Sequence, residues 1–193
     1  MKRTYIILIT IVLTIIAIVG SIGLSPVTLF TETLRVGDVE NEGDDTYHIR
    51  LYDTTGRDIV HLTFISGILP LSWQNLTSIR VSIWHAEDTH IDALRFTFQP
   101  TILHHPLQVY LETPPGGKWS PIVTESSSEH QAFQFSDLGV YGSGTVTLTF
   151  LLRFPPTLPS TRITTSLTLH DTTSPLVFTQ QQATTTLVIP YDG

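Results

Sequence analysis

The chain contains no cysteine among its 193 residues. A disulfide-stapled fold, a thiol nucleophile and a cysteine-ligated zinc site are therefore excluded. Cations are also scarce: apart from Lys2 and Arg3, the chain carries eight basic against seventeen acidic side chains over residues 25–193, a net charge of −9. Because nucleic-acid binding depends on neutralising phosphates, we expect no nucleic-acid partner.

Motifs of common catalytic sites are missing as well. The sequence has no phosphate-binding loop, no dinucleotide fingerprint and no H-E-x-x-H zinc motif. Ser143 lies in "YGSGT", which lacks the first glycine of the G-x-S-x-G nucleophile elbow. We therefore expect a protein that is not an enzyme, and an exported hydrolase is the least favoured of the functions considered below.

The opening segment is the longest apolar run in the chain. Residues from Tyr5 to Leu24 carry no charge, and a helix of that length spans about 30 Å, the thickness of the hydrocarbon core of a bilayer. A secretion signal usually has a shorter apolar region and a small-x-small exit, which only Ser21 and Gly23 resemble here. We predict an uncleaved transmembrane anchor over residues 1–25, with a cleaved signal as the alternative.

The charges beside this segment predict its orientation. Lys2 and Arg3 precede it, and the residues that follow it are rich in Asp and Glu. The positive-inside rule then places the N-terminus in the cytoplasm and residues 27–193 outside. We expect a single-pass protein of the cell membrane with one extracytoplasmic domain.

Beyond Pro26 the chain has the pattern of antiparallel β-structure. In "TVTLTFLLRF" the apolar side chains alternate with threonines, as in strands with one buried and one solvated face. Turn residues separate such segments. In "YDTTGRD", Asp53 and Gly56 suit a hairpin turn. We predict one all-β domain, an antiparallel β-sandwich of immunoglobulin-like or jelly-roll type. The expected strands cover residues 27–36, 46–52, 58–65, 78–84, 92–98, 107–112, 132–136, 145–154, 163–170 and 184–190.

An acidic run, "DVENEGDD", is a candidate calcium site. It is not an EF-hand, because Ile49 occupies the twelfth position, where a bidentate Glu is needed. An irregular calcium site and a hydrated acidic loop both remain open. His48 and His61 fall on the solvated face of one predicted hairpin and form a second candidate for metal binding. The carboxylates of the run are those of Asp38, Glu40, Glu42, Asp44 and Asp45.

Two other histidine-bearing segments are less favourable. The segment "WHAEDTHID", residues 84–92, gathers two histidines and three carboxylates between predicted strands. Its spacing fits no known ligand pattern, and we interpret it as a solvated turn. His104 and His105 are neighbours, so on an extended chain their side chains point to opposite sides.

The three tryptophans are the candidates for ligand binding, because exported sandwiches that bind sugars use exposed aromatic rings. Trp73 and Trp119 lie in loop-like segments, and Trp84 falls on the polar side of its strand. The alternative is that each ring caps an end of the core. Asn75 begins an Asn-Leu-Thr sequon, which is compatible with a glycosylated exterior.

These observations leave two main hypotheses for function. The first is a membrane-anchored cell-surface β-sandwich with a structural or protein-interaction role in the cell envelope. The second is an exported module that binds glycan or calcium through the tryptophans or the acidic run. No cofactor is required by either hypothesis, with calcium as the one possible exception.

Overall fold

A computed structural model describes residues 27–69, 75–102, 106–112, 121–127, 129–136, 144–154, 158–172 and 177–191. In these ranges the chain forms thirteen β-strands and no helix. Accordingly, the described part holds no helix with the length and apolar character needed to cross a bilayer. The anchor predicted over residues 1–25 lies outside the described residues.

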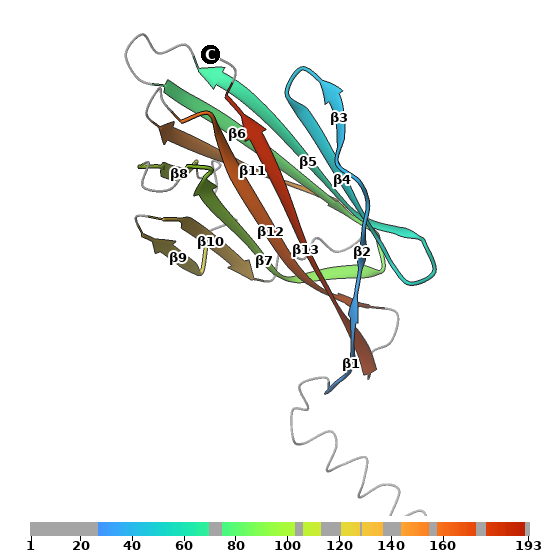
Figure 1. Ribbon diagram of the computed structural model, residues 1–193. Coiled ribbons are helices and arrows are strands. Elements are labelled where there is room, and N and C mark those ends of the chain that lie inside the picture. Colours follow the sequence, from blue (N-terminus) through green and yellow to red (C-terminus); the bar gives the residue numbers. More distant parts are fainter. Residues whose placement is uncertain are drawn as a thin grey trace, which may run out of the picture.

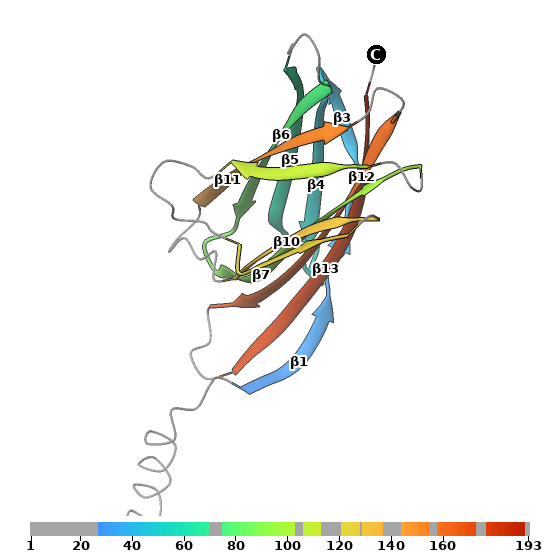
Figure 2. The same cartoon turned by 90° about the vertical axis from the view of Figure 1, so that its left-hand side faces the viewer.

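The strands form two sheets that face each other (Figures 1 and 2). In order across the six-stranded sheet, the strands are β1 (Val27–Thr33), β13 (Val177–Pro190), β12 (Ser160–Asp171), β7 (Thr89–Pro100), β10 (Gln131–Ser136) and β9 (Val123–Ser126). The seven-stranded sheet runs β2 (Arg35–Val36), β4 (Thr46–Tyr52), β5 (Asp58–Leu69), β6 (Asn75–His85), β11 (Gly144–Phe154) and β8 (Gln108–Glu112), and β3 (Glu40–Gly43) pairs with β4. The prediction of an all-β, two-sheet sandwich is confirmed.

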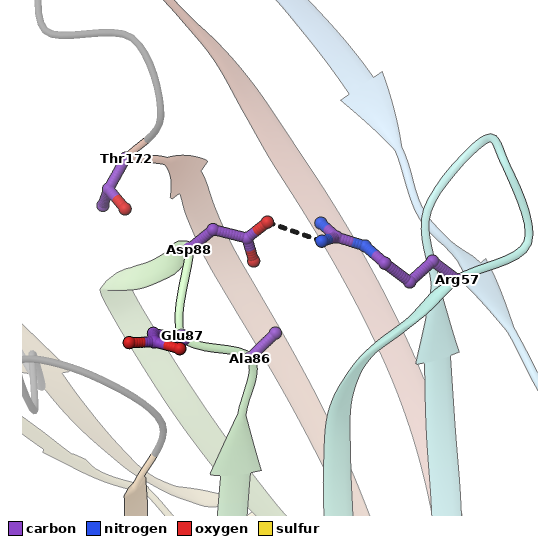
Figure 3. Close-up of a pocket in the computed structure, with 5 residues that line it drawn as sticks. All are labelled: Arg57, Ala86, Glu87, Asp88 and Thr172. Atoms are coloured by element: carbon purple, nitrogen blue, oxygen red, sulfur yellow. Dashed lines mark hydrogen bonds and ion pairs between the residues drawn. The ribbon is translucent and has the colours of Figure 1, made fainter.

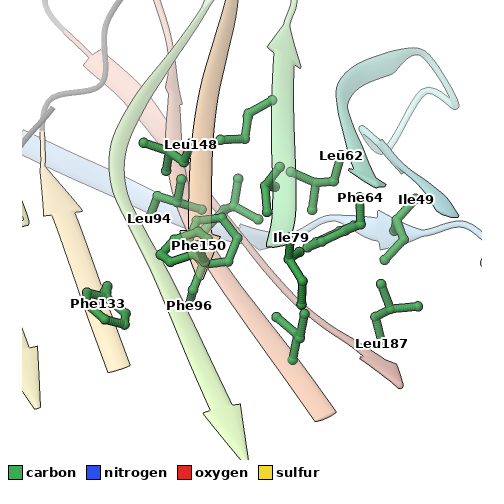
Figure 4. Close-up of a cluster of buried hydrophobic side chains, with 14 of the residues drawn as sticks. Ile49, Leu62, Phe64, Ile79, Leu94, Phe96, Phe133, Leu148, Phe150 and Leu187 are labelled. Atoms are coloured by element: carbon green, nitrogen blue, oxygen red, sulfur yellow. The ribbon is translucent and has the colours of Figure 1, made fainter. Parts of the chain in front are cut away.

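Alternation along the strands builds the core between the sheets. In β7 and β12 every second side chain is buried and its neighbours are at least partly exposed, apart from a shift at Ala93. The centre of the core is aromatic: Phe150 of β11 contacts Phe96 and Phe98 of β7, with ring centroids 5.3 and 4.8 Å apart (Figure 4). Phe133 of β10 lies 5.5 Å from the same ring. Phe150 thus connects its own sheet to two strands of the other.

The first and last strands pair in parallel, whereas all other pairs are antiparallel. Val27 lies opposite Val177, and the pairing continues to Thr33 opposite Gln182. At Leu34 the chain leaves this sheet, and Arg35 then pairs with Tyr52 in the other sheet. The predicted strand over residues 27–36 is therefore two strands, because the chain changes sheets at a buried leucine.

The turn between β4 and β5 has the predicted chemistry. Gly56 takes a positive φ of 85°, which favours glycine. The Asp53 carboxylate accepts hydrogen bonds from the backbone N–H groups of Thr55 and Arg57, both at 2.9 Å. These bonds close the β4–β5 hairpin at the end of the sandwich where β1 begins.

Candidate functional site

The outer surface of the seven-stranded sheet carries the one described tryptophan, Trp84. In β6, residues 77, 79, 81, 83 and 85 are buried, so residues 76, 78, 80, 82 and 84 lie on the opposite, outer side. Trp84 is half-buried there and pairs in register with His61 of β5 and Thr145 of β11. We call this outer surface of β5, β6 and β11, with the adjacent edge strand β8, the tryptophan face.

A histidine and a carboxylate support the Trp84 ring. The His61 and Trp84 rings lie 4.8 Å apart at an angle of 49°. On its far side, Nε2 of His61 contacts Oδ2 of Asp58. This contact orients the imidazole against the indole, so the carboxylate, the imidazole and the indole form one chain of contacts across two strands. Trp84 is thereby held in place while part of its surface stays open to solvent.

His48 and His61 share the outer side of the β4–β5 hairpin, but the register offsets them. His48 lies opposite Thr63, and His61 lies opposite Arg50. Nδ1 of His48 lies 3.1 Å from the Thr63 hydroxyl, and its Nε2 lies 3.2 Å from Glu42 in an ionic contact without hydrogen-bond alignment. The two histidines therefore have different carboxylate neighbours, Glu42 and Asp58.

The acidic run forms β3 and its turn into β4, and its five carboxylate residues are all exposed. Glu40 lies 3.6 Å from Arg50. Asp44 and Asp45 make the turn with φ angles of 48° and 56°. Across the described ranges, no three His, Asp or Glu side chains gather in a way that could hold a metal ion. Metal binding by Asp38, Glu40, Glu42, Asp44, Asp45, His48 and His61 stays a prediction.

A second group of polar residues lies at the end of the sandwich where β1 begins. A hollow of about 480 Å³ is lined by Arg57, Ala86, Glu87, Asp88 and Thr172 (Figure 3). The Arg57 guanidinium donates to Asp88 at 2.5 Å and lies 3.2 Å from Asp53. Hydrogen bonding to Asp88 is the main cause that raises the pKa of Arg57. Arg57 already pairs with two carboxylates, Asp53 of its own turn and Asp88 of the turn between β6 and β7. We call these three residues the latch, because they join the two turns.

Asp53, within this latch, has a lowered pKa. Partial burial by itself would raise the pKa, but the hydroxyl of Thr55, the backbone N–H groups of Thr55 and Arg57, and the Arg57 side chain all donate to the carboxylate and together outweigh burial. The ionised form of Asp53 is therefore the form that the folded hairpin stabilises.

The polar residues of the segment 84–92 separate in the structure. His85 is fully buried, and its Nδ1 lies 2.9 Å from the carbonyl oxygen of Ala86. Glu87 and Asp88 form the turn between β6 and β7, in agreement with the turn predicted here. His90 and Asp92 lie on the outer side of the six-stranded sheet with His170: the two imidazoles are 4.9 Å apart, and Nδ1 of His170 is 2.6 Å from Asp92.

Several predicted site residues lie outside the described residues: Trp73, His104, His105, Trp119 and Ser143. Asn75 is the first residue of β6, and nothing is described of its side chain. Thr77, which completes the sequon, is 1% exposed. Glycosylation at Asn75 stays a prediction.

Sequence reasoning missed that three arginines share the outer side of the seven-stranded sheet: Arg50, Arg80 and Arg153. The parity of their strands could have indicated a common side, because each alternates with apolar residues. What the sequence could not supply was the order of strands, which brings β4, β6 and β11 into one sheet.

These features define the protein as an antiparallel β-sandwich with a partly exposed tryptophan on one outer face. A family model described as "Domain of unknown function (DUF8121)" matches residues 31–191. The chain belongs to this family. Among curated proteins, none matches it.

Some solved structures show a distant likeness to the chain. A non-cellulosomal cohesin from Archaeoglobus fulgidus is 14% identical, with a TM-score of 0.34 over 62% of this chain and 88% of the cohesin. The major pilin SpaD of Corynebacterium diphtheriae is 8% identical, with a TM-score of 0.36 over 74% of this chain and 46% of the pilin. The collagen-binding domain of the Erysipelothrix rhusiopathiae surface protein RspB is 10% identical, with a TM-score of 0.29 over 77% of this chain and 60% of that domain. Likeness at this level carries no argument about function.

Proposed function

We propose that the protein is a membrane-anchored β-sandwich that is displayed on the outer side of the cell membrane and acts by contact with envelope components rather than by catalysis. The apolar segment over residues 1–25 is the anchor, with its N-terminus in the cytoplasm. The observation that carries the proposal is the junction between anchor and domain. The uncharged run ends at Leu24, and edge strand β1 begins at Val27.

Two residues, Ser25 and Pro26, separate the uncharged run from β1 in the sequence. Since Val27 pairs with Val177, the domain is tied to the anchor through two strands of the six-stranded sheet. The latch of Arg57 and Asp88 lies at the same end, because the backbone N–H of Thr172, which follows β12, donates to the Asp88 carbonyl at 2.8 Å. In the proposed arrangement this end faces the membrane and both outer sheet surfaces face sideways, toward neighbouring molecules.

Within this class we assign the sandwich to the jelly-roll type. From β6 onward the chain passes repeatedly between the sheets: β6, β8 and β11 belong to the seven-stranded sheet, whereas β7, the pair β9 and β10, and the pair β12 and β13 belong to the six-stranded sheet. Such alternation is typical of a jelly roll. The assignment affects function only in that the loops collect at the two ends and leave the sheet surfaces flat.

Cell fractionation tests the anchor. We expect the full-length protein to stay in the membrane pellet after washing with alkaline sodium carbonate, and protease added to intact cells to digest the domain. A variant with Ile15→Arg and Ile16→Arg places two charges at the centre of the segment, each costing about 2.5–3.5 kcal/mol, and should move to the wash. Full-length protein in the cytosol, protected from protease, would overturn the proposal.

A second candidate function is ligand binding at the tryptophan face. It is favoured by one observation, the half-buried Trp84 held by His61 among strand-borne hydroxyl groups. An indole whose face stays open to solvent can stack against the apolar side of a sugar ring. The next subsection develops this candidate.

A further inference from the structure

Two arginines of the tryptophan face make no ion pair with any described residue. Arg80 of β6 and Arg153 of β11 are exposed. Within the described part of the chain, neither makes an ion pair or a hydrogen bond. By contrast, Arg50, Arg57 and Arg95 each lie within 3.6 Å of a carboxylate oxygen. Arg162 of β12 is likewise exposed and makes no ion pair among the described residues, but it lies on the other sheet; Arg80 and Arg153 share one outer surface of a domain with a net charge of −9.

The register places these arginines along one line. Arg80 lies opposite Thr149, and Arg153 lies opposite Leu76. They are therefore four residues apart along a pair of neighbouring strands, about 13 Å. We call the outer side chains of β6 and β11 between Trp84 and Arg153 the β6–β11 track. It is lined by Trp84, Ser82, Arg80, Ser78, Thr145, Thr147, Thr149, Leu151 and Arg153.

An aromatic ring lies near each end of the track. Trp84 is on β6, four residues from Arg80. Tyr110 of the edge strand β8 lies opposite Leu151, and it is 52% exposed. Hydroxyl groups fill the surface between the rings; those of Ser82 and Thr147 lie 3.4 Å apart. The track thus presents aromatic faces, hydroxyls and cations in sequence along one flat strip.

Acidic residues on this outer surface are confined to its margins. Glu40 and Glu42 belong to β3 at one edge, and Glu112 belongs to β8 at the other. Asp58, at the start of β5, contacts His61. The strip between these margins is therefore positive within an acidic domain, which is the charge complement of an anionic partner.

We propose that the β6–β11 track binds an anionic polysaccharide, a chain of sugars bearing carboxylate or sulfate groups. Guanidinium groups pair in a fork with such groups, and the rings of Trp84 and Tyr110 stack on sugar faces. The register separates the two arginines by about 13 Å along the strands, a spacing that an extended partner with repeated anionic groups can match. The inference rests on the proposed function, since the face meets such a polymer only outside the cell.

Binding to defined polymers tests the inference. The probe set is polygalacturonate for carboxylates, dextran sulfate for sulfates and neutral dextran as the uncharged control, each immobilised and exposed to the full-length protein in detergent. We expect binding to one or both anionic polymers, weakened by added salt, and none to dextran. Arg80→Gln and Arg153→Gln should each weaken binding about tenfold, the loss of one charge-assisted contact, and Trp84→Ala should weaken it as well.

The matched control is Arg162→Gln. Arg162 lies on the outer side of β12 in the other sheet, is exposed and makes no ion pair among the described residues. The Arg162→Gln substitution removes one positive charge, as Arg80→Gln does, but from the opposite surface. This variant should therefore bind the anionic polymers as tightly as the wild type does. Thermal melting checks that each variant is folded. The inference is overturned if Arg162→Gln weakens binding as much as Arg80→Gln, if dextran binds equally, or if no polymer binds. None of these outcomes touches the anchor, which fractionation tests separately.

Discussion

Replacing Phe150 by alanine tests how the two sheets are held together. The ring is fully buried and contacts three rings of the opposite sheet, those of Phe96, Phe98 and Phe133, at centroid distances of 4.8–5.5 Å. Buried Phe→Ala substitutions cost about 3–5 kcal/mol, from lost transfer energy plus the cavity left behind. The upper half of that range applies here because three aromatic contacts are lost together. For a domain with a stability of about 5–15 kcal/mol, this is a large fraction.

Urea unfolding followed by tryptophan fluorescence and circular dichroism measures the effect. We expect a lower midpoint with an unchanged slope, because the surface exposed on unfolding stays the same. The melting temperature should fall by about 8–16 °C for a loss near 4 kcal/mol. Tyr110→Ala, which removes an exposed ring, is the control and should change stability by no more than about 0.5 kcal/mol. A loss below about 1 kcal/mol in Phe150→Ala would refute the inter-sheet contact.

Three further results are expected. Tyr191→Phe removes the hydroxyl that contacts the buried Thr161 hydroxyl, and it should lower the free energy of unfolding in urea by about 1–3 kcal/mol. Adding Thr161→Val to this variant should restore most of the lost stability. If stability does not recover, the contact between the two hydroxyl groups is contradicted. Asp53→Asn should lower the free energy of unfolding at pH 7, because the folded hairpin stabilises the ionised carboxylate. The difference from the wild type should shrink as the pH falls from about 4 through the lowered pKa of Asp53, since the wild type then loses the same stabilisation. A difference that stays constant over this pH range would contradict the role of the carboxylate. The calcium site at the acidic run stays a prediction, and melting the domain with calcium and with chelator tests it: a bound ion should raise the melting temperature, and equal melting temperatures would remove the site.

Most of the strands could be predicted from the sequence because alternation reports burial directly. Each of the ten expected segments coincides with observed strand, with 27–36 divided into β1 and β2, and β11 has the full pattern of "TVTLTFLLRF". The strands that were missed, β3 and β9, are short and lie at sheet edges. In β3 the four residues Glu40–Gly43 are all exposed, so backbone pairing with β4 holds them and no side-chain pattern marks them.

The contacts within the sites depend on neighbours that are remote in sequence. Arg95 forms a two-point pair with Glu125 across β10, at 3.1 and 2.6 Å. Ala132 of β10 lies opposite Glu125, and its small side chain leaves space for that pair. No local pattern predicts which carboxylate an arginine reaches, nor that Arg80 and Arg153 reach none in the described ranges. These facts follow from strand order, which the sequence does not state.

The parallel pairing of β1 with β13 has a mechanical consequence for an anchored protein. In the proposed arrangement, a force that a bound partner exerts on the sandwich would reach the anchor through β1, along the axis of that strand. Six residue pairs bind β1 to β13 side by side, so the load falls on all of them at once in shear, whereas a hairpin pulled from one end would open bond by bond. In the proposed anchored arrangement, this pairing would therefore resist detachment of β1 under load.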